Sequence, residues 1–204
     1  MAFITGISFK VYDDSGLTTE SSTTLQLTHF TDLSDGDQDF QYYFGSTESN
    51  RVLKATSNPG TDQITITPTR VLPAFAASTA YSLGDIVEPT TPNGYIYEVT
   101  QAGTSSTEPT WPTTLGSTIT TGGVIFTTLS EDHPITEIKL ATSEAGLDGA
   151  TAGASLDLGT SISSGSGNAV EFWLRVTNTI DTVMSNFGNA ELSIAIEEVQ
   201  EESS

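Results

Sequence analysis

Aromatic side chains gather in the middle of this sequence and are of the types that bind sugar rings. Trp111 lies in the compact stretch EPTWP, and Tyr81, Tyr95 and Tyr97 precede it. A flat aromatic face matches the C–H face of a pyranose, and a tyrosine hydroxyl adds hydrogen bonds. These four residues are therefore candidates for a carbohydrate contact.

The same residues have a second interpretation, in which they fill a small core. A unit of about 50 residues has little else to bury, and a tryptophan can serve as its central plug. Tyr95 and Tyr97 are two residues apart and share one face of a strand. Both interpretations, the sugar platform and the core plug, remain open on the sequence alone.

An acidic stretch supplies oxygen ligands of the kind that calcium prefers. Asp32, Asp35, Asp37 and Asp39 lie within eight residues of one another, and carboxylate oxygens suit a hard cation. The spacing departs from the EF-hand pattern, because Phe40 occupies the glycine position and no glutamate closes the loop. Asp35, Asp37 and Asp39 are therefore candidates for a calcium site, with a solvated acidic turn as the alternative.

No pattern in the chain predicts a reaction. The 26 acidic residues make carboxylate pairs common by chance, and His29 and His133 are the two histidines. The sequence holds no nucleophile elbow, phosphate-binding loop or HExxH zinc motif. We predict no catalytic residue, and a hydrolase with paired carboxylates remains a lesser alternative.

Composition excludes several classes of partner. The chain has 204 residues, a formal net charge of −20 and no cysteine. Such an acidic chain repels nucleic acid and anionic membrane surfaces. The first residues, MAFITGISFK, do not resemble a secretory signal, and no apolar run reaches the roughly 18 residues of a membrane span. We expect no nucleic-acid or membrane partner.

Short alternating runs predict an all-β protein. On the flanks, the expected inward residues are Ile7, Phe9 and Val11; Leu25 and Leu27; Ile64 and Ile66; Ile138 and Leu140; Phe172, Leu174 and Val176; and Leu192, Ile194 and Ile196. We expect Pro68 to end its strand, residues 32–39 to form a turn, and the charged C-terminal tail to fray.

The middle of the chain interrupts this pattern with three further strands, GDIV, YIYEVT and VIFTTL. Neither flank alone has enough strands for a sandwich, and surface loops accept insertions cheaply. We therefore predict an antiparallel β-sandwich built from residues 1–72 and 131–204. A small β module, residues 73–130, is inserted into it.

The inner motifs AYSLGDIV, GYIYEVTQAGTS, EPTWP and GSTITTGGVIF are similar to a small module of bacteriophage virion proteins. That module looks like the chitin- and cellulose-binding modules of carbohydrate-active enzymes. In such modules a tryptophan usually stands near the end of the last strand, where this chain has Phe126. The resemblance implies contact with a cell-surface polysaccharide.

The outer motifs YFGS, SNPGTDQI, EIKLA and SGSGNAVEFWLRV resemble structural proteins of tailed phages. This resemblance implies a virion-surface protein, a capsid decoration (cement) or tail or baseplate accessory, made in the host cytoplasm and bound to other virion proteins. Closed symmetric association commonly stabilises such proteins, so we expect a homotrimer or larger ring. The alternative is a carbohydrate-binding adhesion protein that acts in host recognition.

Overall fold

The protein is all-β, with several antiparallel sheets. The computed structural model describes residues 6–21, 36–180, 192–196 and 198–203, and every pairing between its named strands is antiparallel. The helical turns are three short 3₁₀ segments, η1 (Ile135–Glu137), η2 (Glu144–Asp148) and η3 (Ser166–Asn168). Within those ranges no helix is long and apolar enough to cross a membrane.

The first sheet has four strands in the order β1-β2-β14-β11. Their bounds are β1 (Lys10–Tyr12), β2 (Asp37–Gly45), β14 (Val170–Thr177) and β11 (Ile138–Ala141). In β14 the residues Phe172, Leu174 and Val176 are buried while their neighbours in sequence are not, as alternation predicts. The predicted inward residues Ile138 and Leu140 of β11 are buried as well.

Two three-stranded sheets, β12-β4-β15 and β13-β3-β16, continue one another. Their strands are β3 (Arg51–Ala55), β4 (Ile64–Arg70), β12 (Leu156–Gly159), β13 (Ser161–Ser163), β15 (Leu192–Ile196) and β16 (Val199–Ser203). Strands β12 and β13 follow one another in the chain and pair with β4 and β3 in turn. Strands β15 and β16 pair with β4 and β3 in the same order, on the other side of these two central strands. Residues 56–63 are an excursion between the two central strands, closed by a turn at Gly60.

These three sheets share one hydrophobic core. Phe44 and Phe172 come from the first sheet, while Leu53, Ile66 and Ile194 come from the other two. Leu53, Ile66 and Phe172 are fully buried. Burial of apolar area at about 25 cal/mol per Å² is the main force that holds such layers together.

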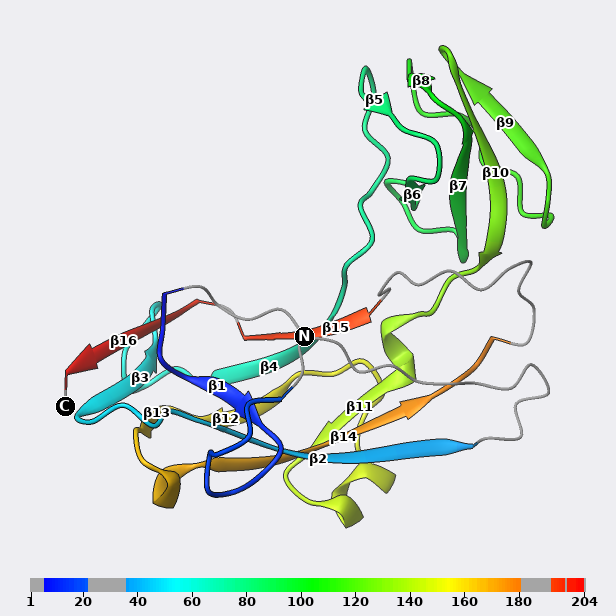
Figure 1. The fold of residues 1–204 in the computed structure, drawn as a ribbon. Helices are drawn as coiled ribbons and strands as arrows, with labels where there is room; N and C mark the ends of the chain where they lie inside the picture. Colours follow the sequence, from blue (N-terminus) through cyan, green and yellow to red (C-terminus); the bar gives the residue numbers. More distant parts are fainter. Residues whose placement is uncertain (1–5, 22–35, 181–191, 197, 204) are drawn as a thin grey trace.

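Residues 80–131 form two further sheets of their own. The larger has the order β6-β7-β10-β9, and the smaller pairs β5 with β8. The bounds are β5 (Ala80–Tyr81), β6 (Ile86–Val87), β7 (Tyr95–Gln101), β8 (Gly103–Thr104), β9 (Thr118–Thr121) and β10 (Val124–Glu131). Figure 1 shows these strands, in green, standing apart from the remaining sheets. Strands β6, β7 and β10 match the three predicted runs, whereas β5, β8 and β9 were not predicted.

Three local expectations were wrong. Strand β4 does not end at Pro68. Pro68 pairs with Ile194 of β15 and lies past the stretch of β4 that pairs with β12. At that position a missing N–H is tolerated, because β4 has a single neighbouring strand there. The C-terminal tail forms β16 and pairs with β3 rather than fraying.

The third error concerns the acidic stretch, because Asp37 and Asp39 belong to strand β2 and not to a turn. The predicted strand around Leu25 and Leu27 lies outside the described residues, as do Asp32 and Asp35.

Candidate functional site

The aromatic residues of the middle segment surround two phenylalanines. Phe126 is fully buried on β10, and Phe75 is 4% exposed on the segment that leads into β5. Trp111 contacts both edge-on, with ring centroids 5.6 Å from Phe75 and 5.2 Å from Phe126. Tyr81 stacks on Phe75 at 6.1 Å and meets Phe126 edge-on at 5.3 Å. The candidate aromatic residues therefore assemble around Phe75 and Phe126, and no sequence pattern had pointed to Phe75.

Trp111 is half-buried in this cluster, and its polar edge is fixed. Its indole Nε1–H donates to Glu108 Oε1 at 2.9 Å, and the same carboxylate accepts hydrogen bonds from the backbone N–H and hydroxyl of Thr90. Partial burial disfavours the charged carboxylate, but the donors outweigh it and keep the pKa of Glu108 below its ordinary value. The ring is thus held in one orientation.

Tyr97 belongs to the interior. It is fully buried, and its ring centroid lies 4.4 Å from that of Trp111. Its hydroxyl donates to Pro112 O at 2.8 Å and accepts from Asn93 Nδ2 at 2.7 Å. Burial raises the pKa of the Tyr97 phenol. In this position Tyr97 supports the loop that carries Trp111 and has no surface to offer a sugar.

Tyr81 and Tyr95 are half-buried, as Trp111 is. The Tyr81 hydroxyl accepts from the backbone N–H of Ala76 at 2.8 Å. Tyr95 packs against the margin of the same aromatic core, beside Asn93, whose Oδ1 accepts its N–H at 3.1 Å. The structure therefore places three rings, Tyr81, Tyr97 and Trp111, around the two phenylalanines, with Tyr95 at the margin.

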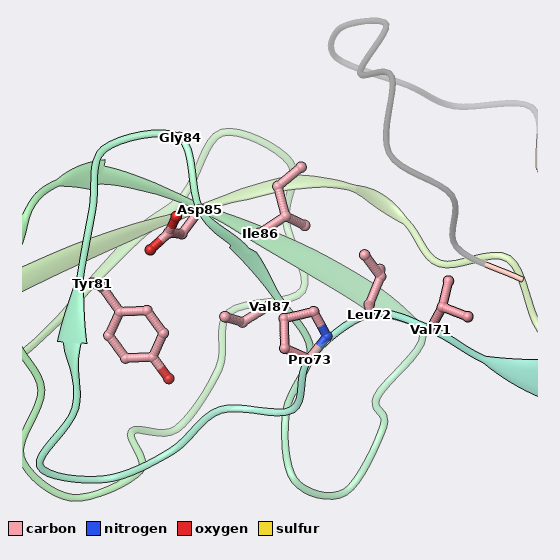
Figure 2. Close-up of a pocket in the computed structure, with 8 residues that line it drawn as sticks. All are labelled: Val71, Leu72, Pro73, Tyr81, Gly84, Asp85, Ile86 and Val87. Atoms are coloured by element: carbon pink, nitrogen blue, oxygen red, sulfur yellow. The ribbon is translucent and has the colours of Figure 1, made fainter. Parts of the chain in front are cut away.

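A pocket of about 370 Å³ opens beside Tyr81. It lies between the linker Val71–Pro73 and the loop from Tyr81 to Val87, as Figure 2 shows. Its lining side chains are apolar apart from the Asp85 carboxylate and the Tyr81 hydroxyl. A volume of this size falls in the range of small-ligand sites. The sequence did not point to this pocket, because the linker and the run GDIV come together only in the folded chain.

The calcium candidates Asp37 and Asp39 face an arginine. Arg175 on β14 makes a bidentate contact with Asp39, with both N–O distances at 2.7 Å, and also reaches Asp37 at 3.4 Å. Hydrogen bonds from Arg175 hold the pKa of Asp39 below its ordinary value. Asp35 lies outside the described residues. Within the described part of the chain, no group of three or more His, Asp or Glu side chains is arranged to hold a metal ion.

A buried charge cluster joins the middle segment to the rest of the chain. Arg70, at the end of β4, donates from Nε to Glu88 Oε2 at 2.6 Å, and its Nη2 contacts Asp132. The side chains of Glu88 and Asp132 are 10% and 3% exposed. Glu88 follows β6 and Asp132 follows β10. Arg70 therefore ties together the strand before the middle segment, the segment itself and the linker that returns from it.

His133, in the returning linker, is held by a carboxylate. Its Nδ1 lies 2.6 Å from Glu137 Oε2, and the other Glu137 oxygen accepts the backbone N–H of Thr179 at 2.7 Å. The Glu137 side chain is 2% exposed. Both carboxylate oxygens are thus engaged within the fold. This arrangement fixes the linker to the end of β14.

Taken together, the aromatic cluster and the adjoining pocket are the parts of the described structure best suited to contact another molecule. Comparisons with protein-family models, curated proteins and solved structures found no match to this chain.

Proposed function

We propose that this protein is a non-enzymatic structural protein on the surface of a bacteriophage particle, of the capsid decoration or tail accessory type. In this proposal residues 1–72 and 131–204 form an antiparallel β-sandwich that attaches to other virion proteins. Residues 73–130 form an inserted module that the sandwich presents outward.

One observation supports this two-part design above the others. Each strand from β5 to β10 pairs within its own group, and the described pairings join none of them to a strand of the flanks. The aromatic core around Phe126 is likewise separate from the core around Phe172. Segments with separate cores and separate hydrogen bonding behave as separate domains.

The placement of polar groups supports a structural role. The His133–Glu137 pair and the Arg70 cluster lie at the junction and are engaged in contacts within the fold. The motifs of the outer halves, which resemble tailed-phage structural proteins, supply the particle assignment. In this proposal the buried polar groups fix the geometry between the two parts and take no part in a reaction.

Quantitative mass spectrometry of purified phage particles tests the particle assignment. The proposal predicts a fixed copy number of this chain per particle, measured against the major capsid protein of the same preparation. A copy number that stays constant through density-gradient purification and a high-salt wash supports it. Recovery of the chain in the lysate only, with none on washed particles, contradicts it.

The half-buried aromatic residues favour a second candidate, a carbohydrate-binding adhesion protein. Trp111 and Tyr81 are each half-buried, and Trp111 lies beside Glu108, whose carboxylate also binds Thr90. A glycan array with the intact protein tests this candidate. Binding that Trp111→Phe weakens and Trp173→Phe leaves unchanged supports a sugar contact at Trp111.

A further inference from the structure

The two exposed large apolar side chains of the described residues belong to the two segments that form the pocket. Val71 is 41% exposed and lines the pocket, and Leu83 is 70% exposed on the loop that forms the opposite wall. Figure 2 shows Tyr81 and Asp85 at one end of this pocket and Val71 and Leu72 at the other. Exposed apolar residues that coincide with a concavity mark an interaction surface.

The walls of the pocket are fixed before any partner binds. On the loop side, Gly84 N–H donates to Val99 O at 2.9 Å and Val99 N–H donates to Asp85 O at 2.8 Å. On the linker side, Glu88 N–H donates to Pro73 O at 3.0 Å. A pre-organised site avoids the entropic cost of ordering its own loops on binding.

Charge indicates what such a pocket accepts. Asp85 is its one charged lining residue, and it is exposed. One carboxylate oxygen accepts the backbone N–H of Ser82 at 2.7 Å, which fixes the side chain and leaves the second oxygen for a partner. Residues 70–132 contain six carboxylates and one basic residue, Arg70, which already pairs with Glu88 and Asp132. The local field therefore favours a cation over an anion.

We propose that this pocket is a docking site for a basic side chain, arginine or lysine, flanked by apolar residues on a partner protein. The apolar neighbours would cover Val71 and Leu83, and the cation would pair with Asp85. An arginine or lysine also has an apolar stem that suits a lining of Leu72, Ile86 and Val87.

A second copy of this chain fits the pocket poorly. Five of its six basic residues already form ion pairs with carboxylates of their own chain; they are Lys10, Arg51, Lys54, Arg70 and Arg175. The sixth, Lys139, is half-buried in β11. The inference therefore goes beyond the proposed function by naming the chemistry of a different protein, and it stands without the particle assignment.

Titration of the ¹⁵N-labelled full-length chain with short blocked peptides tests the proposal. The probes are Ac-Gly-Leu-Arg-Leu-Gly-NH₂, its Gln analogue, and Ac-Gly-Gly-Arg-Gly-Gly-NH₂. We expect the Leu-Arg-Leu peptide to shift the amide signals of residues 71–73 and 81–87, at concentrations up to about 5 mM for a weak single-site contact. The other two peptides should bind about tenfold more weakly, because the Gln analogue lacks the positive charge and the Gly-flanked peptide lacks the apolar neighbours.

The matched variants are Asp85→Asn and Asp157→Asn. Asparagine at 85 keeps an acceptor for Ser82 N–H, so the loop is retained, while Asp157 is an exposed carboxylate on β12 away from the pocket. We expect about a tenfold loss of peptide affinity for the first variant and no change for the second.

Three results would overturn the proposal. One is no shift of these amides with the Leu-Arg-Leu peptide, and another is equal binding of the Arg and Gln peptides. In the third, the Arg peptide has no effect, but the same amide signals shift when chito-oligosaccharide is added or when the protein concentration alone is raised. That result would assign the pocket to a sugar or to a second copy.

Discussion

Trp111 and Trp173 make the same hydrogen bond in different surroundings. Each indole N–H donates to a glutamate close in sequence, Glu108 at 2.9 Å and Glu171 at 2.8 Å. Trp111 also contacts three aromatic rings, whereas Trp173 lies on the outer face of β14 between buried residues that point the other way. Variants of the two tryptophans therefore separate the effect of ring packing from the effect of the indole hydrogen bond.

We expect Trp111→Ala to destabilise the middle segment by about 3 kcal/mol, because it removes a half-buried ring from a small core. Trp173→Ala should cost about 1 kcal/mol or less. Hydrogen exchange resolved by mass spectrometry measures both. The first variant should lose protection in β7 and β10 and keep it in β2 and β14. Unchanged protection in β7 and β10, together with lost glycan binding, would favour the sugar-platform interpretation instead.

Arg70 neutralises two carboxylates that have little access to water. Because Glu88 and Asp132 are buried, Arg70→Gln leaves unpaired charge in the interior and should cost about 3–5 kcal/mol. Arg51→Gln is the matched control, since the Arg51 side chain is 44% exposed and its contact with Glu201 is 3.3 Å long. That change should cost about 1 kcal/mol at most.

Urea unfolding of the two arginine variants measures the difference. Adding Glu88→Gln and Asp132→Asn to Arg70→Gln should restore part of the lost stability, because the unpaired charges are then gone. Equal unfolding midpoints for the two single arginine variants would show that the junction does not depend on Arg70.

Strand β8 depends on close backbone approach to the turn between β9 and β10. A Cβ atom at Gly103 would lie 2.3 Å from the carbonyl oxygen of Gly123, so a side chain forces the turn to move. Gly103→Ala should destabilise the middle segment by about 1–3 kcal/mol, as overpacking does. At Gly167 a Cβ meets nothing within 4 Å, and Gly167→Ala should be close to neutral.

Thermal melts followed by the near-ultraviolet signal of the aromatic cluster compare the two glycine variants. A midpoint for Gly103→Ala that equals the Gly167→Ala midpoint would mean that β8 can withdraw from the turn without cost.

Alternation predicted the strands that bury one face against a core. The β14 residues Phe172, Leu174 and Val176 are the clearest example, and β4, β10 and β11 follow the same pattern. Strands β5, β8 and β9 have only two to four residues each, which is too short for an apolar period to show in the sequence.

The remaining errors depend on partners distant in sequence. The acidic tail becomes β16 because Arg51 and Lys54 on β3 form ion pairs with Glu201 and Glu202. The aromatic candidates were found from their types, but the buried position of Tyr97 depends on Phe75 and Pro112, which come from other elements. Residue type predicted the group, and tertiary contacts decided which members reach the surface.

Across its described residues the molecule combines three apolar clusters, around Phe172, Phe126 and Ile96, with a strong excess of negative charge. Its net charge is −20, and five of its six cations are already paired within the chain. Like charges on neighbouring copies repel within a screening distance of about 8 Å at physiological salt. Any ring of copies must therefore rely on apolar contact or on cations from other proteins, which is consistent with a basic partner at the Asp85 pocket.

Deletion of the middle segment tests the two-part architecture most directly. The variant joins Leu72 to His133 through a short Gly/Ser bridge, which removes Glu88 and Asp132 together and leaves Arg70 near the surface. Its ¹H–¹⁵N spectrum is compared with that of the full chain and with that of the isolated segment 73–131. If residues 73–130 are an inserted module, the amide signals of β2, β3 and β14 keep their dispersion and positions in the deletion variant. Collapse of those signals into the narrow range of an unfolded chain would show that the outer sheets need the middle segment to fold.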